Sequence, residues 1–286
     1  MKRNSTGHRG KEHGETETCS HPVRLNGLCA VCGKTLPHEH REEAGHTIQA
    51  YDKKISYTKE YAAEMSKQEQ ETLHAEKKLA LIIDLDQTII HTTYDSADPA
   101  LSSGNATHRL AFTDGTERTY HVKTRPLLKQ FLKRMSRLYQ MHIYTMGTQE
   151  YAKAVLAQIV DPQGKYFGSR VVTREGTGDF EAKSIERVCT VEEHMAVVLD
   201  DRSDVWTNTG NLIKVPPYTF FGCGDINKPA AAQEHRQQKT EGDKVLERAA
   251  NILTDIHRRY YTGKTKNTEK IIRVMKKKKS FPWPAV

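Results

Sequence analysis

Two carboxylates stand directly after a continuous apolar run in this 286-residue sequence. Asp84 and Asp86 follow residues 79–83, and the alternation of side chains along a strand lets both reach one ligand at its end. A carboxylate can attack phosphorus, and a second carboxyl can protonate the leaving oxygen and later activate water. The pair therefore predicts phosphoryl transfer, with Asp84 as the nucleophile and Asp86 as the general acid and base.

A second acidic pair, Asp200 and Asp201, follows another apolar run at residues 195–199. The carboxyl ends of parallel strands meet at one edge of a sheet, so four carboxylates are expected to converge there. They repel one another unless a cation lies among them, and their hard oxygen atoms suit magnesium. The sequence predicts an Mg²⁺ site formed by Asp84, Asp86, Asp200 and Asp201.

Two further side chains are candidates for neutralising charge on the transferred phosphoryl group. Thr145 follows the strand-like run 139–144 and offers a hydroxyl donor, and Lys183 offers an ammonium group. Each has a structural alternative, because Thr145 can be an ordinary hydroxyl at a strand end and Lys183 can be a surface lysine. Lys165 lies in the same interval of the chain and competes with Lys183 for this role.

Strand-like runs alternate with helical periodicity through the middle of the chain. The runs cover 79–83, 139–144, 169–173, 195–199 and 212–215, and helices are predicted over 56–78, 126–135, 149–159 and 243–261. This order is typical of right-handed βαβ units, so we predict an α/β fold with a doubly wound, Rossmann-like parallel sheet. The segment 95–120, with turn residues at 113–116, predicts a small hairpin insertion, and a polar N-terminal segment precedes the core.

Composition separates the ends of the chain from this core. Residues 1–18 are predicted to be a disordered tail, 56–262 the catalytic domain, and 263–286 a basic tail. The stretch 264–279 holds eight Lys or Arg and one Glu, a net +7 of the chain's +8, which confines any nucleic-acid contact to that tail. No segment has the length of a membrane span or the core of a signal peptide, so an intracellular protein without membrane contact is expected.

Residues 19–40 carry a compact group of cysteines and histidines. Cys19, His21, Cys29 and Cys32 supply four ligands of the type that zinc prefers, which predicts a knuckle-like zinc site. The alternative is a set of reduced, unliganded cysteines, and the nearby His38 and His40 offer competing ligands.

The candidate residues lie within four ordered motifs. Asp84-Leu85-Asp86-Gln87-Thr88 has the form Asp-x-Asp-x-Thr, and the segments 122–126, 143–148 and 198–206 supply the other three. In these motifs the chain resembles the haloacid dehalogenase superfamily, and within it the RNA polymerase II C-terminal-domain phosphatase family of the TFIIF-associated type. The sequence Gly-Leu-Cys-Ala-Val-Cys-Gly at 27–33 resembles the same subgroup.

The resemblance implies a protein serine/threonine phosphatase that acts on the C-terminal heptad repeats of RNA polymerase II through an aspartyl-phosphate on Asp84, with Mg²⁺. It also implies that Asp86 offers its backbone carbonyl to the metal and that Arg125 and Asp161 support the site. The phosphorylated repeats and TFIIF are the implied partners, and the nucleus is the implied location. The subgroup normally carries a BRCT domain after the helix ending near Tyr261, and the roughly 25 residues that follow here are too few for one.

Two alternatives to an active protein phosphatase remain. The same fold can serve as a catalytically silent phosphopeptide-binding or scaffold module, which the missing BRCT domain favours and the intact Asp84 and Asp86 oppose. A small-metabolite phosphatase of the same superfamily usually closes its crevice with a cap domain, and no segment of this chain is long enough for a large one.

Overall fold

The computed structural model describes residues 19–25, 27–36, 46–50, 53–94, 98–102, 107–110, 119–174, 182–222 and 242–277. The disordered tail predicted for 1–18, the turn predicted at 113–116, and both His38 and His40 lie outside these residues.

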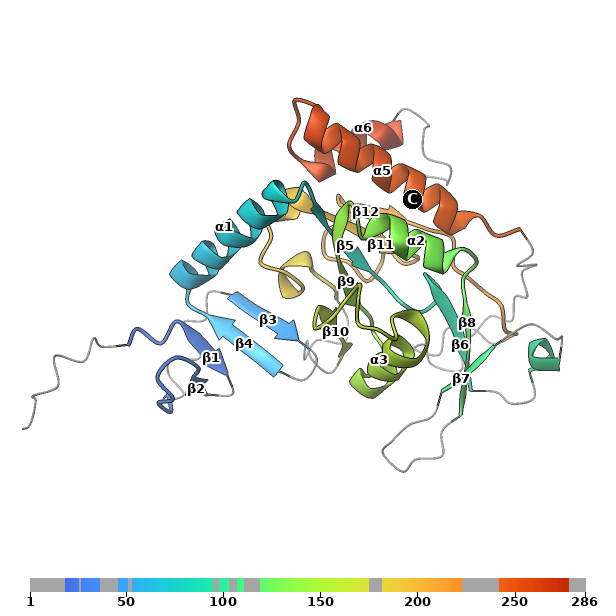
Figure 1. The fold of residues 1–286 in the computed structure, drawn as a ribbon, viewed down its shortest axis with the longest axis horizontal. Helices are drawn as coiled ribbons and strands as arrows, with labels where there is room; N and C mark the ends of the chain where they lie inside the picture. The colour runs from blue at the N-terminus through green and yellow to red at the C-terminus, as the bar shows by residue number, and fades with distance from the viewer. Residues whose placement is uncertain are drawn as a thin grey trace, which may run out of the picture.

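A five-stranded, all-parallel sheet forms the centre of the molecule (Figure 1). Its strands are β5 (Leu79–Ile83), β9 (Tyr139–Tyr144), β10 (Val171–Val172), β11 (Ala196–Asp200) and β12 (Leu212–Lys214). Every residue of β5 and of β11 is buried, because both faces of the sheet are covered. The continuous apolar runs in the sequence are therefore strands of a doubly wound sheet, and the predicted fold class is confirmed.

In the strand order β10-β9-β5-β11-β12, the strand that comes first in the sequence, β5, lies at the centre of the sheet. From β5 the chain moves outward to β9 and β10, and it then crosses to β11 and β12 on the other side of β5. The direction of winding thus reverses between β5 and β11. Such a switch point leaves a crevice beyond the carboxyl ends of the two strands, where ligands bind in folds of this kind.

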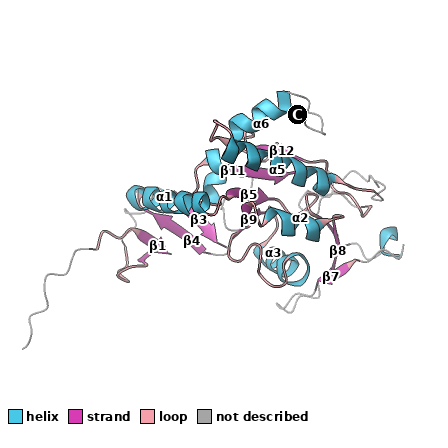
Figure 2. Ribbon diagram, turned by 45° about the horizontal axis from the view of Figure 1, so that its top comes forward, coloured by secondary structure: helices cyan, strands magenta, loops and turns pink. Residues whose placement is uncertain are grey.

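Helices cover both faces of the sheet. The helices are α1 (Lys59–Ala75), α2 (Leu128–Met135), α3 (Gln149–Val155), α5 (Val245–Thr262) and α6 (Thr268–Lys277), with short turns η2 (Pro99–Ser102), η4 (Ile185–Arg187) and η5 (Glu193–Met195) and a π-helical turn η3 (Leu156–Val160). Figure 2 shows α5 between α6 and α2, with α3 next to α2. Tyr139 of β9 donates its hydroxyl hydrogen to the carbonyl of Leu253 in α5, at 2.7 Å, which ties that helix to the sheet.

The predicted hairpin insertion is a three-stranded antiparallel sheet. Its order is β6-β8-β7, with β6 (Ile90–Thr93), β7 (His108–Leu110) and β8 (Tyr120–Thr124). The hairpin itself is the β7–β8 pair, in which Leu110 stands opposite Tyr120. The strand β6 was not predicted, because Ile90–Thr93 mixes apolar and polar residues that are all buried in the fold.

A second antiparallel sheet precedes the core, in the order β2-β1-β4-β3. It consists of β1 (Val23–Leu25), β2 (Leu28–Cys29), β3 (His46–Ala50) and β4 (Lys53–Tyr57). The helix predicted from residue 56 therefore starts later, at Lys59. Thr58 sets this boundary, since its extended backbone ends the strand and its Oγ1 accepts a hydrogen bond from the N–H of Tyr61 at 3.3 Å.

The prediction of a basic tail over residues 263–286 is wrong for the part of the chain that forms α6. Ile271, Ile272 and Met275 are buried there, and the hydroxyl of Thr268 donates to the carbonyl of Ala196 at 2.8 Å. The apolar residues at 271, 272 and 275 form a helical stripe that the high charge count concealed. None of the helices in the described ranges is long and apolar enough to cross a membrane.

Candidate active site

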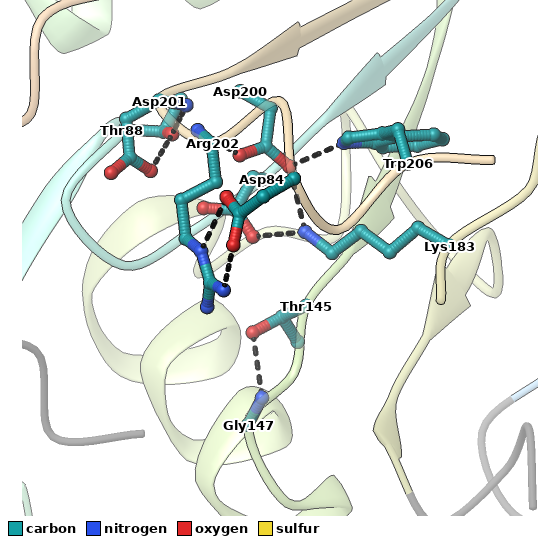
Figure 3. A network of polar contacts seen from close by, with 10 residues as sticks. Asp84, Thr88, Thr145, Gly147, Lys183, Asp200, Asp201, Arg202 and Trp206 are labelled. Atoms are coloured by element: carbon teal, nitrogen blue, oxygen red, sulfur yellow. Dashed lines mark hydrogen bonds and ion pairs between the residues drawn. The ribbon is translucent and has the colours of Figure 1, made fainter. Parts of the chain in front are cut away.

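Three carboxylates meet at the switch point of the central sheet (Figure 3). Asp84 follows β5, and its N–H donates to the carbonyl of Leu199 at 3.0 Å, which continues the strand pairing to that residue. Asp200 is the last residue of β11, and Asp201 follows it. Side-chain oxygen atoms of Asp84, Asp200 and Asp201 all lie within 4.8 Å of one another, and all three residues are buried. The predicted convergence of acidic side chains is thus present in the structure.

Lys183 lies between two of these carboxylates. Its Nζ is 2.7 Å from Oδ1 of Asp84 and 2.8 Å from Oδ2 of Asp200, and the residue is only 2% exposed. Burial opposes the charge on this ammonium group, but Asp200 and Asp84 outweigh it and raise the pKa of Lys183. The site therefore holds a buried lysine whose charged form is favoured by its two aspartate partners. The competing candidate Lys165 lies over the ring of Tyr166.

A short stretch of paired backbone fixes the position of Lys183. Its N–H donates to the carbonyl of Val205 at 2.6 Å, and its carbonyl accepts from the N–H of Thr207 at 3.0 Å. The intervening residue, Trp206, donates its indole N–H to Oδ2 of Asp200 at 2.9 Å. Trp206 lies within the last sequence motif, but nothing in the sequence alone assigned it this contact.

The carboxylate of Asp84 is buried among other acidic groups. Burial raises its pKa well above the usual range, and the neighbouring Asp200 and Asp201 add to this shift, whereas Lys183 opposes it. The attacking form of a carboxylate is the ionised one, so this side chain needs positive charge nearby to be a nucleophile.

Asp201 is held by the threonine of the first motif. The hydroxyl of Thr88 donates to Oδ1 of Asp201 at 3.1 Å, and the N–H of Asp201 donates to the same Thr88 oxygen at 3.0 Å. These two bonds join the turn after β5 to the turn after β11. They orient the Asp201 carboxylate toward Asp84 and Asp200.

Asp86 occupies a different setting from the other three aspartates. Its Oδ1 accepts a hydrogen bond of 2.5 Å from the hydroxyl of Tyr151, and that hydroxyl is 2.6 Å from Oγ1 of Thr92. Tyr151 lies in α3, four residues after Gly147. A Cβ atom added to Gly147 would come within 2.8 Å of the Tyr151 ring, so the glycine makes space for it. No motif or periodicity in the sequence pointed to Tyr151, because the contact joins residues 65 positions apart.

Thr145 stands at the same edge of the sheet as Asp84. It follows β9, which pairs with β5 so that Ile143 is level with Ile83. Its Oγ1 accepts a hydrogen bond from the N–H of Gly147 at 3.0 Å, which leaves the hydroxyl hydrogen free to donate to an anion. The structure therefore brings Thr145, Lys183 and the acidic residues to one edge.

Arg125 supports the site from behind. It is 2% exposed, and its guanidinium donates to the carbonyls of Thr88 and Pro216, both at 2.9 Å, and to Oδ2 of Asp243 at 3.0 Å.

Asp161 does not join the crevice, because its carboxylate accepts hydrogen bonds from the N–H groups of Lys165, Tyr166 and Phe167 and so organises its own loop. The crevice is lined by Asp84, Asp86, Met146, Lys183, Asp200, Asp201, Arg202 and Val205.

The second predicted site is also assembled. Ligand atoms of Cys19, His21, Cys29 and Cys32 lie within 4.8 Å of one another, far from the crevice in sequence and with a different chemistry.

A doubly wound sheet with an acidic crevice and a buried lysine at its switch point defines a phosphatase fold of the haloacid dehalogenase type. Residues 79–229 match the family described as NLI interacting factor-like phosphatase, and the chain belongs to this family. The resemblance predicted from the four motifs is thereby confirmed.

Several relatives of this chain are phosphatases of the RNA polymerase II C-terminal domain. The phosphatase of this name from Schizosaccharomyces pombe is 41% identical over 232 residues, which are 74% of this chain and 32% of the relative. Its counterpart from Encephalitozoon cuniculi is 37% identical over 230 residues, 80% of this chain and 53% of the relative. The chain thus spans between about a third and a half of these two relatives.

A solved structure described as Fcp1, an essential RNA polymerase II CTD phosphatase, is similar in fold and sequence. The identity is 36%, the TM-score is 0.63, and the match covers 74% of each chain. A fission yeast Fcp1 variant bound to beryllium fluoride matches at 34% identity with a TM-score of 0.64.

Proposed function

We propose that the chain is an Mg²⁺-dependent protein serine/threonine phosphatase that removes phosphate from the C-terminal heptad repeats of RNA polymerase II. The observation that carries the proposal is the position of Lys183, which bridges Asp84 and Asp200 at the switch point. A buried ammonium beside a buried aspartate nucleophile is the arrangement needed to accept a dianionic phosphoryl group. The names of the relatives supply the substrate.

The first chemical step uses both carboxylates of the first motif. Asp84 attacks phosphorus, so that a bond forms between its oxygen and phosphorus while the bond from phosphorus to the serine oxygen breaks. Asp86 gives a proton to that leaving oxygen. In the second step Asp86 takes a proton from water, which attacks the aspartyl-phosphate and releases inorganic phosphate together with the free Asp84 carboxylate. Tyr151 orients Asp86 for both transfers through its 2.5 Å hydrogen bond.

Charge on the phosphoryl group is balanced by two groups at the same edge of the sheet. Lys183 provides one full positive charge, and the hydroxyl of Thr145 provides a hydrogen-bond donor. Trp206 and Arg202 act on Asp200 instead, because the Trp206 indole and the Arg202 backbone N–H both donate to its carboxylate, at 2.9 and 2.8 Å. Asp200 is thereby held in place while Lys183 faces the substrate.

The residues present fit a magnesium ion. Asp84, Asp200 and Asp201 offer three hard oxygen ligands within 4.8 Å of one another. Burial is the main cause of the raised pKa of Asp84, and the neighbouring Asp200 and Asp201 carboxylates add to it. We propose that these three side chains and the backbone carbonyl of Asp86 hold the ion. When bound, it supplies positive charge that offsets the repulsion between the Asp84 carboxylate and the incoming phosphate.

The setting of the reaction is part of the proposal. A substrate in the polymerase repeats implies action in the nucleus, and TFIIF is the second partner that the family resemblance suggests. The crevice accepts an extended peptide, because the insertion between β5 and α2 contributes a small sheet and not a cap domain among the described residues.

The test is phosphate release from a phosphorylated heptad-repeat peptide and from para-nitrophenyl phosphate, with Mg²⁺ or with a chelator. The parent chain is compared with Asp84→Asn, which keeps the shape of the side chain but removes the attacking charge, and with Asp204→Asn. Asp204 is an acidic neighbour whose side chain is 69% exposed. We expect Mg²⁺-dependent release by the parent and by Asp204→Asn, and none by Asp84→Asn.

Two outcomes would change the proposal. Stable binding of the phosphopeptide without release would favour the catalytically silent binding or scaffold module. Release from the aryl phosphate but not from the peptide would retain the chemistry and reject the substrate.

A further inference from the structure

The side chains of Cys19, His21, Cys29 and Cys32 form a cluster of four potential metal ligands, which we call the Cys/His group. The Sγ atoms of Cys19 and Cys29 are 3.8 Å apart, and Sγ of Cys32 is 3.3 Å from Nδ1 of His21. All four ligand atoms lie within 4.8 Å of one another. Each side chain therefore points into one shared space.

These separations are those of a tetrahedral zinc site. With Zn–S bonds of about 2.3 Å and Zn–N bonds of about 2.0–2.1 Å, a tetrahedron has S–S edges of about 3.8 Å and S–N edges of about 3.6 Å. A disulfide would instead bring two sulfur atoms to about 2.05 Å, and all four cysteines in the described part of the chain are free. The distances fit ligands around an ion better than they fit an oxidised pair.

The backbone after Cys29 is shaped to support a thiolate. The N–H of Val31 lies 3.4 Å from the Cys29 sulfur and points its hydrogen at it. The N–H of Gly33 bonds to the Cys29 carbonyl at 2.9 Å, and Gly33 has a φ of 74°, which a glycine adopts without strain. This turn places Cys29 and Cys32 on the same side, so that both can contact one ion.

The segment has almost no apolar core with which to hold this arrangement. Among the described residues between 19 and 36, only Cys29 is buried, while Leu28 is 46% exposed and Val31 is 64% exposed. A chain segment of this size that buries so little apolar surface needs another source of stability, and metal binding supplies it in small domains.

We propose that Cys19, His21, Cys29 and Cys32 bind one structural Zn²⁺, through three thiolate sulfurs and Nδ1 of the imidazole. Four protein ligands complete a tetrahedron and leave no position for substrate, which is typical of a structural site and not of a catalytic one. Sulfur and nitrogen ligands also select zinc over magnesium, whereas the oxygen ligands of the crevice select magnesium. The proposal does not depend on phosphatase activity.

The Cys/His group lies beside the contacts that join the N-terminal sheet, β2-β1-β4-β3, to helix α1. Pro22, next to His21, accepts a hydrogen bond of 3.0 Å from the N–H of Thr58, the residue that caps α1. The following strand, β1, pairs with β4 so that Val23 stands opposite Tyr57. Both figures place β1 beyond β4 and β3 as seen from the central sheet (Figures 1 and 2). Zinc at this point fixes the outer strands onto the pair that leads into α1.

The experiment is a measurement of zinc per chain in the full-length protein after dialysis, by plasma mass spectrometry. We expect about one zinc ion in the parent and a loss of most of it in Cys32→Ser and in His21→Gln. Cys189→Ser, at a buried cysteine outside the group, and Asp201→Asn, in the crevice, should both retain it. His40→Gln should retain it as well.

A second measurement guards against variants that fail to fold. Titration of the parent protein with a mercurial reagent should release zinc in step with the loss of thiolates, and cobalt substitution should give the visible absorption of a tetrahedral thiolate complex. A parent protein that neither contains nor takes up zinc would overturn the proposal. So would loss of zinc from Asp201→Asn or Cys189→Ser, or retention in both Cys32→Ser and His21→Gln.

Discussion

The acidic crevice and the Cys/His group each gather polar side chains at one point, but they do so in opposite ways. The crevice takes its residues from positions 84 to 205, and strands buried on both faces set the place of the carboxylates. The Cys/His group takes its residues from positions 19 to 32, on a segment whose described residues include a single buried one. The crevice is therefore organised by the buried core of the protein, whereas we propose that zinc organises the Cys/His group.

This difference also determines what each site can do. In the crevice, Lys183 already balances part of the negative charge, so the fold can hold the acidic residues together and still admit a ligand. In the Cys/His group, the proposed zinc ion would use all four ligands. Preorganisation by a buried core lets the crevice bind a substrate, whereas four protein ligands around one ion would leave no position for a substrate in the Cys/His group.

The largest effect should come from Lys183→Met in the crevice. Loss of the buried ammonium should lower kcat/KM for para-nitrophenyl phosphate by about 10²- to 10³-fold, because the charge on the phosphoryl group loses its fixed counterpart. Lys165→Met is the matched control, at the other lysine of that interval, and it should retain activity. Equal losses in the two variants would show that the crevice is not preorganised around Lys183.

The next largest effect should come from Ile272→Ala in α6. This fully buried side chain packs on the core, so its truncation should lower the free energy of unfolding by about 2–4 kcal/mol in urea denaturation. Val274→Ala, two residues away and 46% exposed in the parent, should change it by less than about 0.5 kcal/mol. Indistinguishable unfolding curves would mean that α6 does not belong to the region that preorganises the crevice.

A smaller effect is expected for Tyr151→Phe. The variant removes the hydroxyl that donates to Asp86, and hydrogen bonds to charged groups contribute about 1.5–3 kcal/mol, so kcat for the aryl phosphate should fall roughly 10- to 100-fold. Tyr166→Phe, in the loop organised by Asp161, should leave kcat near the parent value. An unchanged kcat in Tyr151→Phe would remove Tyr151 from the mechanism.

The smallest effects are expected for Thr→Ala substitutions at the N-terminal caps of two helices. Thr58 caps α1 and Thr148 caps α3, each accepting a 3.3 Å hydrogen bond, so either change to Ala should lower the free energy of unfolding by about 1 kcal/mol. Only Thr148→Ala should also lower kcat, because α3 carries Tyr151. A drop in kcat for Thr58→Ala of the same size would show that the two regions are coupled.

The sequence was most informative where local pattern and final environment agree. The runs at 79–83 and 139–144 are strands with the predicted boundaries. The first is apolar throughout because the strand is buried on both faces of the sheet. The aspartates that follow the first of them could be placed at one edge with Asp200 and Asp201, since the parallel topology brings carboxyl ends together.

The sequence was least informative where distant contacts decide the structure. Ile90–Thr93 forms β6 because its polar side chains are buried by the insertion, and α6 packs on the core through three residues among many charged ones. Tyr151 reaches Asp86 only because α3 follows β9 across the sheet. Asp161 was assigned to the site through resemblance, and its three backbone hydrogen bonds instead organise its own loop.

The ion pair between Arg125 and Asp243 limits how far this chain can be shortened with the crevice intact. Trp206 closes the last of the four motifs and binds Asp200, so a minimal design guided by the motifs alone would stop there. Yet Asp243, at the start of α5, fixes the guanidinium that holds the Thr88 carbonyl, and Thr88 in turn holds Asp201. A transplantable catalytic unit must therefore extend at least through α5, and any domain fused to it belongs beyond α6.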